Sequence, residues 1–253
     1  MSSRGLGHYL KRLKMRNDAG ERLEKAPVRR TRDVVIGGIK GLVLIIAVAL
    51  LLSFLIKTFL FRAFYIPSGS MEDTLQIGDR VFVNLLVPEP MSLKHGDIVV
   101  FKDSQGWLGN SVAPPGPIEN MFIALGIAPD NSSEHLIKRV IGLPGDRVVC
   151  CTSQGRVSVN DQPIAEPYLA SDAQHGSGQD SPTFDVVVPT GKVWVMGDNR
   201  NNSSDSRFHQ DSLGKGFVPL EDIVGKATVI AWPINHWTVL DSFSDTFTGP
   251  ASK

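Results

Sequence analysis

A single long apolar segment constrains this chain more than any other feature of its sequence. Residues 34–60 are strongly apolar and are interrupted only by Lys40 and Lys57. As a helix, this segment of 27 residues would extend roughly 40 Å, whereas the hydrocarbon core of a membrane is ~30 Å thick. A cleaved export signal is the alternative, but its apolar stretch is usually about 7–15 residues long, and no clean small-x-small site follows here. We therefore predict an uncleaved transmembrane helix over residues 34–60.

The charges that flank this segment predict how the chain crosses the membrane. Residues 1–33 contain ten Lys or Arg against four Asp or Glu, although the net charge of the whole chain is zero. Basic flanking segments stay on the cytoplasmic side. We expect a basic cytoplasmic tail at residues 1–33, a single pass through the plasma membrane, and an extracytoplasmic remainder in contact with membrane lipids. The zero net charge gives no indication of a nucleic-acid partner.

Beyond the apolar segment, short apolar runs alternate with Gly and Pro turns, which is typical of a β-rich domain and not of alternating strands and helices. The runs expected to form strands are 80–86, 97–102, 135–141, 147–151, 156–159, 184–188, 192–196 and 224–232. We predict a mainly β extracytoplasmic domain over residues 61–240. Within it, residues 103–133 read as an irregular insertion and residues 149–189 as a small accessory β region. Residues 241–253 are expected to form a mobile tail.

The cysteines and histidines give no indication of a metal or cofactor. The two cysteines are adjacent, Cys150 and Cys151, and the six histidines are scattered, without HExxH or CxxC spacing. An extracytoplasmic location permits disulfides, but neighbours in an extended strand point to opposite faces, so a bond between them requires strain. Two interpretations stay open: small residues at a strand end, or a disulfide between neighbours. No metal site and no cofactor are predicted.

The segment at residues 65–75 follows the apolar segment closely and contains the first candidate for chemistry. Ser70 follows Ser68 and Gly69, behind the rigid Pro67. A serine becomes a nucleophile when a base takes its proton, but no histidine here lies in a motif that suggests this role. Alternatively Ser70 caps a helix, because the residues from Ser70 to Asp73 fit a loose capping box. The segment alone leaves both interpretations open.

A lysine can replace histidine as the base if its pKa falls from ~10.4 towards neutrality, which burial among apolar side chains can cause. Lys138 lies in the apolar run 136–141 and is the candidate, although a lysine exposed on a strand is the alternative. A third cluster at residues 197–207 is dense in Asp, Asn, Ser and Arg. It could form a surface turn, or it could orient a buried base through its hydroxyl and carboxylate groups.

Three motifs together resemble the signature boxes of the bacterial type I signal peptidases. They are residues 66–71 (IPSGSM), 138–146 (KRVIGLPGD) and 197–207 (GDNRNNSSDSR), in the family's order and behind an N-terminal anchor. The resemblance implies a membrane-anchored serine endopeptidase of the single-span form, with a β-rich catalytic domain and a small accessory β region. The implied activity removes N-terminal signal peptides from exported preproteins after small residues, at Ala-x-Ala sites.

The resemblance also implies a role for each matching residue. Ser70 matches the nucleophile, Lys138 the general base, and Ser68 the hydroxyl that joins the Ser70 backbone N–H in the oxyanion hole. Ser203 matches the hydroxyl that orients the lysine. The remaining matches support the polar loop (Asp198, Arg200, Asp205 and Arg207) or line shallow apolar pockets for small substrate side chains (Phe64, Ile66, Met71 and Ile137).

The motifs also depart from the family's pattern in places. Asp73 stands where the family often has proline, and Asn201 stands where aspartate is common, but neither change removes a catalytic group. Secretory preproteins are the expected partners, and the chain is expected to act as a monomer. A membrane-anchored β domain that binds a partner protein without catalysis is the alternative. Trp237 is a candidate for contact with the membrane interface, and Phe243 another, whereas Trp232 is expected in the core.

Overall fold

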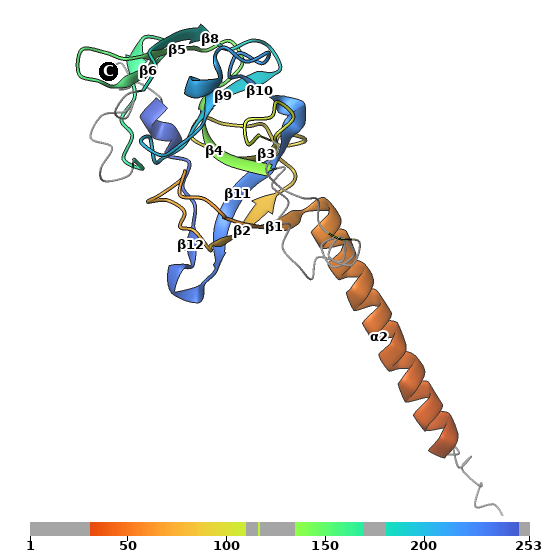
Figure 1. The fold of residues 1–253 in the computed structure, drawn as a ribbon. Coiled ribbons are helices and arrows are strands. Elements are labelled where there is room, and N and C mark those ends of the chain that lie inside the picture. Colours follow the sequence, from red (N-terminus) through yellow and green to blue (C-terminus); the bar gives the residue numbers. More distant parts are fainter. Residues whose placement is uncertain (1–30, 110–115, 117–134, 170–180, 248–253) are drawn as a thin grey trace, which may run out of the picture. The chain divides into compact units, whose positions relative to one another are not determined.

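A computed structural model describes residues 31–109, 116, 135–169 and 181–247 of the chain. The chain divides into two compact units, residues 1–52 and residues 53–253. Helix α2 (Thr31–Phe59) begins in the first unit, and its stretch of 25 residues from Val35 to Phe59 has a mean hydropathy of 2.8 (Figure 1). A helix of this length and composition can cross a membrane. Most of the predicted basic tail, residues 1–30, lies outside the described residues.

The second unit contains two antiparallel β sheets (Figure 1). The larger has eight strands in the order β1-β2-β11-β3-β4-β9-β10, and β12 pairs with β11. Strand β4, which carries Lys138, is paired on both sides, with β3 and β9, so its backbone is firmly held. The strands are β1 (Phe61–Tyr65), β2 (Arg80–Asn84), β3 (Ile98–Lys102), β4 (His135–Gly142), β9 (Lys192–Met196), β10 (Val218–Pro219), β11 (Ile223–Trp232) and β12 (Thr238–Val239).

The smaller sheet has four strands in the order β7-β6-β5-β8. They are β5 (Arg147–Cys150), β6 (Val157–Val159), β7 (Gln162–Pro163) and β8 (Phe184–Val187). Four short 3₁₀ helices complete the described elements: η1 (Ser206–His209), η2 (Leu220–Asp222), η3 (Ile234–His236) and η4 (Ser244–Phe247). The two sheets and the N-terminal apolar helix confirm the prediction of a mainly β protein with a small accessory β region. Most of the predicted insertion, residues 110–115 and 117–134, lies outside the described residues.

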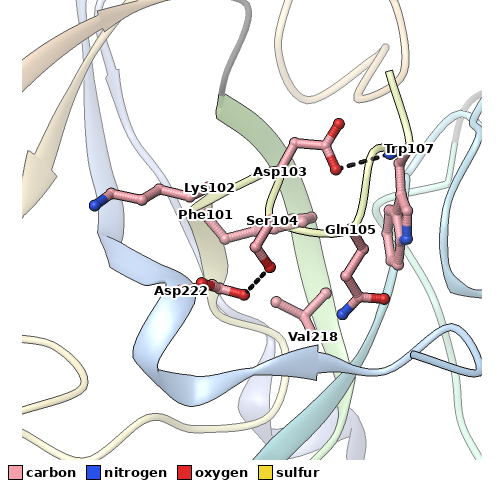
Figure 2. Close-up of a pocket in the computed structure, with 8 residues that line it drawn as sticks. All are labelled: Phe101, Lys102, Asp103, Ser104, Gln105, Trp107, Val218 and Asp222. Carbon is pink, nitrogen blue, oxygen red and sulfur yellow. Dashed lines mark hydrogen bonds between the residues drawn. The ribbon is translucent and has the colours of Figure 1, made fainter. Parts of the chain in front are cut away.

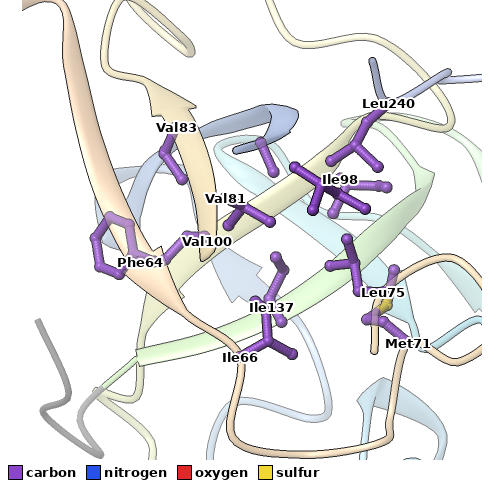
Figure 3. Packing of buried hydrophobic residues seen from close by; sticks show 12 residues of the cluster. Phe64, Ile66, Met71, Leu75, Val81, Val83, Ile98, Val100, Ile137 and Leu240 are labelled. Carbon is purple, nitrogen blue, oxygen red and sulfur yellow. The ribbon is translucent and has the colours of Figure 1, made fainter. Parts of the chain in front are cut away.

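An apolar cluster fixes the segment that follows Ser70 (Figure 3). Met71 and Leu75 are fully buried in this cluster, beside Ile66 and Ile137. The Leu75 N–H donates to the Met71 carbonyl at 2.8 Å, which closes a single turn, and the structure has no helix between β1 and β2. The interpretation of Ser70 as the cap of a helix is therefore wrong, because burial of the two apolar side chains holds the segment as a turn.

Two further expectations concern the cysteines and the C-terminal segment. The sulfur atoms of Cys150 and Cys151 are bonded to each other, so the disulfide is the interpretation that the structure supports. Residues 241–247, which belong to the expected mobile tail, make contacts with the β domain: the Asp241 carbonyl accepts a hydrogen bond from Arg139, and the Phe247 ring stacks on His95.

Two aromatic side chains differ from expectation. Trp232 was expected in the core, but it lies at the end of β11 and is 51% exposed. Phe243 was a candidate for the membrane interface, but it is half-buried and its ring centroid lies 5.7 Å from Cζ of Arg139. Trp232 pairs with Arg80 of β2, yet its side chain stays exposed, whereas the buried guanidinium of Arg139 attracts the aromatic ring of Phe243.

Candidate active site

The hydroxyl of Ser70 and the amine of Lys138 lie in direct contact. Nζ of Lys138 donates a hydrogen bond to Oγ of Ser70 at 2.7 Å, and the two residues are 2% and 7% exposed, respectively. Burial lowers the pKa of Lys138 from its ordinary value of 10.5 to about 8, against the carboxylates of Asp205 and Asp198, which raise it. Lys138 is therefore not an exposed strand lysine, and part of its population is neutral near physiological pH.

Asn199 holds the backbone at Gly69 and Ser70 through hydrogen bonds to both carbonyls. Ser68 is exposed, and its hydroxyl lies 3.5 Å from Oγ of Ser70. The Gly69 carbonyl accepts a hydrogen bond from Nδ2 of Asn199 at 3.1 Å, and the Ser70 carbonyl accepts one from the Asn199 N–H at 3.2 Å. A Cβ on Gly69 would lie 2.7 Å from Oε2 of Glu72, so a larger residue would displace that carboxylate. Asn199, which contacts two carbonyls, was not among the predicted site residues.

Asp205 organises the polar loop at residues 197–207. Its carboxylate accepts hydrogen bonds from the Gly197 N–H at 2.9 Å, from Oγ of Ser203 at 2.8 Å and from Nε of Arg207 at 2.8 Å. Although burial alone would raise the pKa of Asp205, these hydrogen bonds, first of all that from Arg207, lower it. Ser203 donates its proton to Asp205, because an ionised carboxylate is a strong acceptor, and its oxygen keeps lone pairs that can accept a hydrogen bond from the Lys138 amine.

Gly197 brings this loop directly against the nucleophile. A Cβ on Gly197 would lie 2.2 Å from Oγ of Ser203 and 2.4 Å from the carbonyl oxygen of Ser70. Real Cβ atoms do not approach other atoms so closely, so a glycine is required here. The position of the loop therefore determines the position of Ser70.

A second buried carboxylate in the loop, Asp198, pairs with the neighbour of Lys138. Oδ1 of Asp198 accepts from Nε of Arg139 at 2.8 Å, and Oδ2 accepts from Nη2 at 2.6 Å. Both side chains are 0% exposed. Oδ2 also accepts from the Thr74 hydroxyl at 2.6 Å, which ties the segment after Ser70 to the loop. An arginine inside an apolar strand was the sequence signal for this pair, but its partner could not be read from the sequence.

The predicted apolar pocket residues also come together. Phe64, Ile66, Met71 and Ile137 belong to one cluster, and Ile66 and Ile137 lie side by side (Figure 3). Their exposed fractions range from 0% for Met71 to 7% for Ile137. Figure 2 shows a different pocket, at the end of β3. None of the predicted site residues lines it, since its lining consists of Phe101, Lys102, Asp103, Ser104, Gln105, Trp107, Val218 and Asp222.

Sequence reasoning missed two further residues, Glu166 and Tyr168. The Glu166 carboxylate binds the guanidinium of Arg200, and the ring centroid of Tyr168 lies 3.9 Å from Cζ of Arg139. Both residues follow β7, between the second and third sequence motifs. No spacing or periodicity in the sequence pointed to them.

The arrangement is chemically suited to acyl transfer. A serine hydroxyl bonded to a buried amine with a pKa near 8 can lose its proton to that amine and attack a carbonyl carbon. A mainly β domain with a serine in contact with a buried lysine, preceded in the chain by a helix that can cross a membrane, fits the class of serine hydrolases.

Comparison with known proteins identifies the family within this class. The family described as "Signal peptidase, peptidase S26" matches residues 39–232. The chain therefore belongs to the signal peptidase I family and is a serine peptidase.

Several bacterial relatives are similar over most of their length. The signal peptidase I of Mycobacterium tuberculosis (strain ATCC 25618 / H37Rv) is 35% identical over 217 residues, which cover 77% of this chain and 73% of that protein. The probable signal peptidase I of Mycobacterium leprae is 33% identical and covers 75% of each chain. The signal peptidase I of Leptolyngbya laminosa is 36% identical over 76% of this chain and 78% of its own length.

Proposed function

We propose that this protein cleaves N-terminal signal peptides from exported preproteins, with Ser70 as the nucleophile and Lys138 as the general base. Membership of the family implies signal-peptide cleavage. The hydrogen bond of 2.7 Å between the buried Lys138 amine and the Ser70 hydroxyl is the observation that carries the assignment of roles. Burial of Lys138 disfavours its charged form and so costs stability, and a β domain that only binds a partner gives no reason for this cost.

The proposed reaction follows from this pair. Neutral Lys138 takes the proton of Ser70 as Oγ attacks the scissile carbonyl carbon, and the resulting oxyanion accepts hydrogen bonds from the Ser70 N–H and the Ser68 hydroxyl. The Lys138 ammonium then gives its proton to the leaving amine. Water hydrolyses the acyl-enzyme, with Lys138 again as the base, and regenerates the free serine.

The proposed specificity for small residues rests on the packing of the apolar residues assigned to the substrate pockets. Ile66 and Ile137 are 2% and 7% exposed within one apolar cluster, so we expect a pocket that they line to admit a methyl group with little displacement and to exclude a phenyl ring. Apolar side chains also offer no partner for a charge.

The function is tested by incubating the purified protein with a preprotein that carries an Ala-x-Ala site. We expect cleavage after the second alanine, and a fall in kcat/KM of at least about 100-fold when that alanine is replaced by phenylalanine. The matched control carries the same replacement at the x position, where kcat/KM should stay within about threefold. Equal cleavage after alanine and phenylalanine would contradict the proposed specificity.

The pH dependence of cleavage tests Lys138 as the base. Only the neutral amine can accept the Ser70 proton, so kcat/KM should rise with pH, tenfold per unit well below the pKa, and level off above about pH 8. The measurement is kcat/KM for one preprotein between pH 5.5 and about 9.5. A profile that is flat from pH 6 to 9 would exclude a lysine base with this pKa.

We also propose that the catalytic domain lies on the outer surface of the plasma membrane, with the N-terminus in the cytoplasm. β1 begins two residues after α2 ends, so the connection between span and domain is short. One face of the sheet aligns Phe82, Val229 and Val239 across three paired strands. Exposed large apolar side chains on or next to β1, β2, β11, η3 and β12, which suit a lipid interface, are Phe61, Tyr65, Phe82, Trp232, Ile234, Trp237 and Val239.

A further inference from the structure

The carboxylate of Glu166 lies outside the three sequence motifs but is buried against the polar loop. Its side chain is 3% exposed, and that of Arg200 is 0% exposed. Oε2 accepts from Nη1 of Arg200 at 3.1 Å, while Oε1 accepts from Nη2 of Arg200 and from the Tyr168 hydroxyl. Two hydrogen bonds between a carboxylate and a guanidinium fix the plane of both groups. Glu166 therefore determines the orientation of Arg200.

Arg200 also contacts the backbone of Gly197, which packs against the nucleophile Ser70. Nε of Arg200 donates to the Gly197 carbonyl at 3.0 Å. Gly197 has no free space, since a Cβ there would lie 2.4 Å from the carbonyl oxygen of Ser70 and 2.2 Å from Oγ of Ser203. A continuous series of contacts thus leads from Glu166 to the backbone of Ser70.

Tyr168 connects Glu166 to the strand that carries Lys138, because it contacts both Glu166 and Arg139. Its hydroxyl donates to Oε1 of Glu166 at 2.9 Å, and its ring centroid lies 3.9 Å from Cζ of Arg139. Burial raises the pKa of Tyr168 well above its ordinary value, so the hydroxyl keeps its proton and remains a donor. The segment at residues 166–168 therefore contacts the supports of both Ser70 and Lys138.

We propose that Glu166 is a positioning residue for the Ser70–Lys138 pair, an inference that rests on the catalytic roles proposed above. Glu166 acts by holding Arg200 and, through it, the polar loop against the nucleophile. Without this carboxylate, the buried guanidinium of Arg200 has no ion-pair partner among the described residues, so the loop must shift to solvate it. A misplacement of about 1 Å at a catalytic group can cost about 100-fold in rate.

The experiment compares full-length variants on a preprotein with an Ala-x-Ala site. Glu166→Gln should lower kcat about 10- to 100-fold and leave KM within about twofold, because the apolar contacts proposed for the substrate are unchanged. Glu166→Asp keeps the charge and should recover part of the lost kcat. If Glu166→Gln does not fold, Tyr168→Phe, which removes one hydrogen bond from the same carboxylate, should still lower kcat about two- to tenfold. A parental kcat in whichever of these two variants folds would overturn the proposal.

Two controls separate positioning from general destabilisation and from a wrong mechanism. Val157→Ala opens a cavity in the core of the smaller sheet, where Val157 is 0% exposed, and should lower Tm without lowering kcat. If Val157→Ala lowers kcat as much as Glu166→Gln does at a similar Tm, the positioning role is wrong. Ser70→Ala is measured in parallel. Cleavage by Ser70→Ala would overturn the proposed mechanism itself, whereas an inactive Ser70→Ala beside a fully active Glu166→Gln would overturn only the positioning role.

Discussion

Replacing Lys138 with methionine is expected to abolish cleavage and, at the same time, to stabilise the folded protein. Without a base the Ser70 hydroxyl keeps its proton, and removal of one member of a catalytic unit typically lowers kcat by about 10⁴- to 10⁶-fold. Methionine has a similar length and no charge, so the apolar surroundings of the side chain are retained. The expected signature is thus an inactive variant that is harder to unfold.

The gain in stability follows from the lowered pKa of Lys138. A pKa of about 8 in place of 10.5 means that the folded state disfavours the ammonium by about 3 kcal/mol. Between these two pH values the unfolded chain binds more protons than the folded one, so stability rises with pH, and the full cost is present below about pH 8. Removal of the charge should therefore raise the free energy of unfolding by about 1–3 kcal/mol at pH 7, and by much less near pH 10.5.

Denaturation of the full-length variants in detergent at both pH values measures this difference. Ser70→Ala is the matched comparison, since it should be equally inactive but not more stable: it leaves the Lys138 amine buried and removes the hydroxyl to which that amine donates. If Lys138→Met keeps near-normal cleavage, Lys138 is not the base. If it is no more stable than the parent at pH 7, burial of the ammonium is not costly at this site.

The strands could be predicted from the sequence because their signals are local. The predicted strand at residues 135–141 is β4 (His135–Gly142), and the one at residues 192–196 is β9. Each is an apolar run bounded by turn residues, and such a run has few other ways to bury its side chains. The end of β11 at Trp232 was also predicted, but the expected burial of Trp232 was wrong, because the exposure of this side chain depends on which strands lie beside it.

Residues of the candidate site could be predicted from the sequence only where they lie in a motif. Ser70 and Lys138 lie in motifs, whereas the partner of Arg200 is Glu166, 34 residues away, and the partner of Arg139 is Asp198, 59 residues away. Tertiary structure decides which carboxylate meets which guanidinium, and many acidic residues could satisfy the charge. The same holds for Ser203, since the sequence does not show that its hydroxyl donates to Asp205.

Neutralising Asp198 is expected to be among the most destabilising single changes in the protein. Asp198→Asn keeps the shape of the side chain but leaves the fully buried guanidinium of Arg139 without its carboxylate. Breaking a buried ion pair from one side costs about 3–5 kcal/mol, because one charge remains in a medium that cannot solvate it. This is a large part of the roughly 5–15 kcal/mol that holds a typical domain folded.

The protein provides a matched control for this change on its surface. Arg147 and Asp185 form the same pair of hydrogen bonds, at 2.8 and 2.6 Å, but their side chains are 46% and 54% exposed. Because water solvates either partner, Asp185→Asn should leave Tm essentially unchanged, while Asp198→Asn lowers it by many degrees. Equal shifts in Tm for the two variants would mean that burial does not set the cost.

A double variant separates the cost of a lone buried charge from the value of the pair. Arg139→Met combined with Asp198→Leu removes both charges, so it should lose less stability than Asp198→Asn alone. The Gly96 and Asp241 carbonyls would still lose the donor that Arg139 provides, so recovery should be partial. If the double variant is instead less stable than Asp198→Asn, then the ion pair itself stabilises this part of the fold. The loss in Asp198→Asn would then not come mainly from an unpaired buried charge.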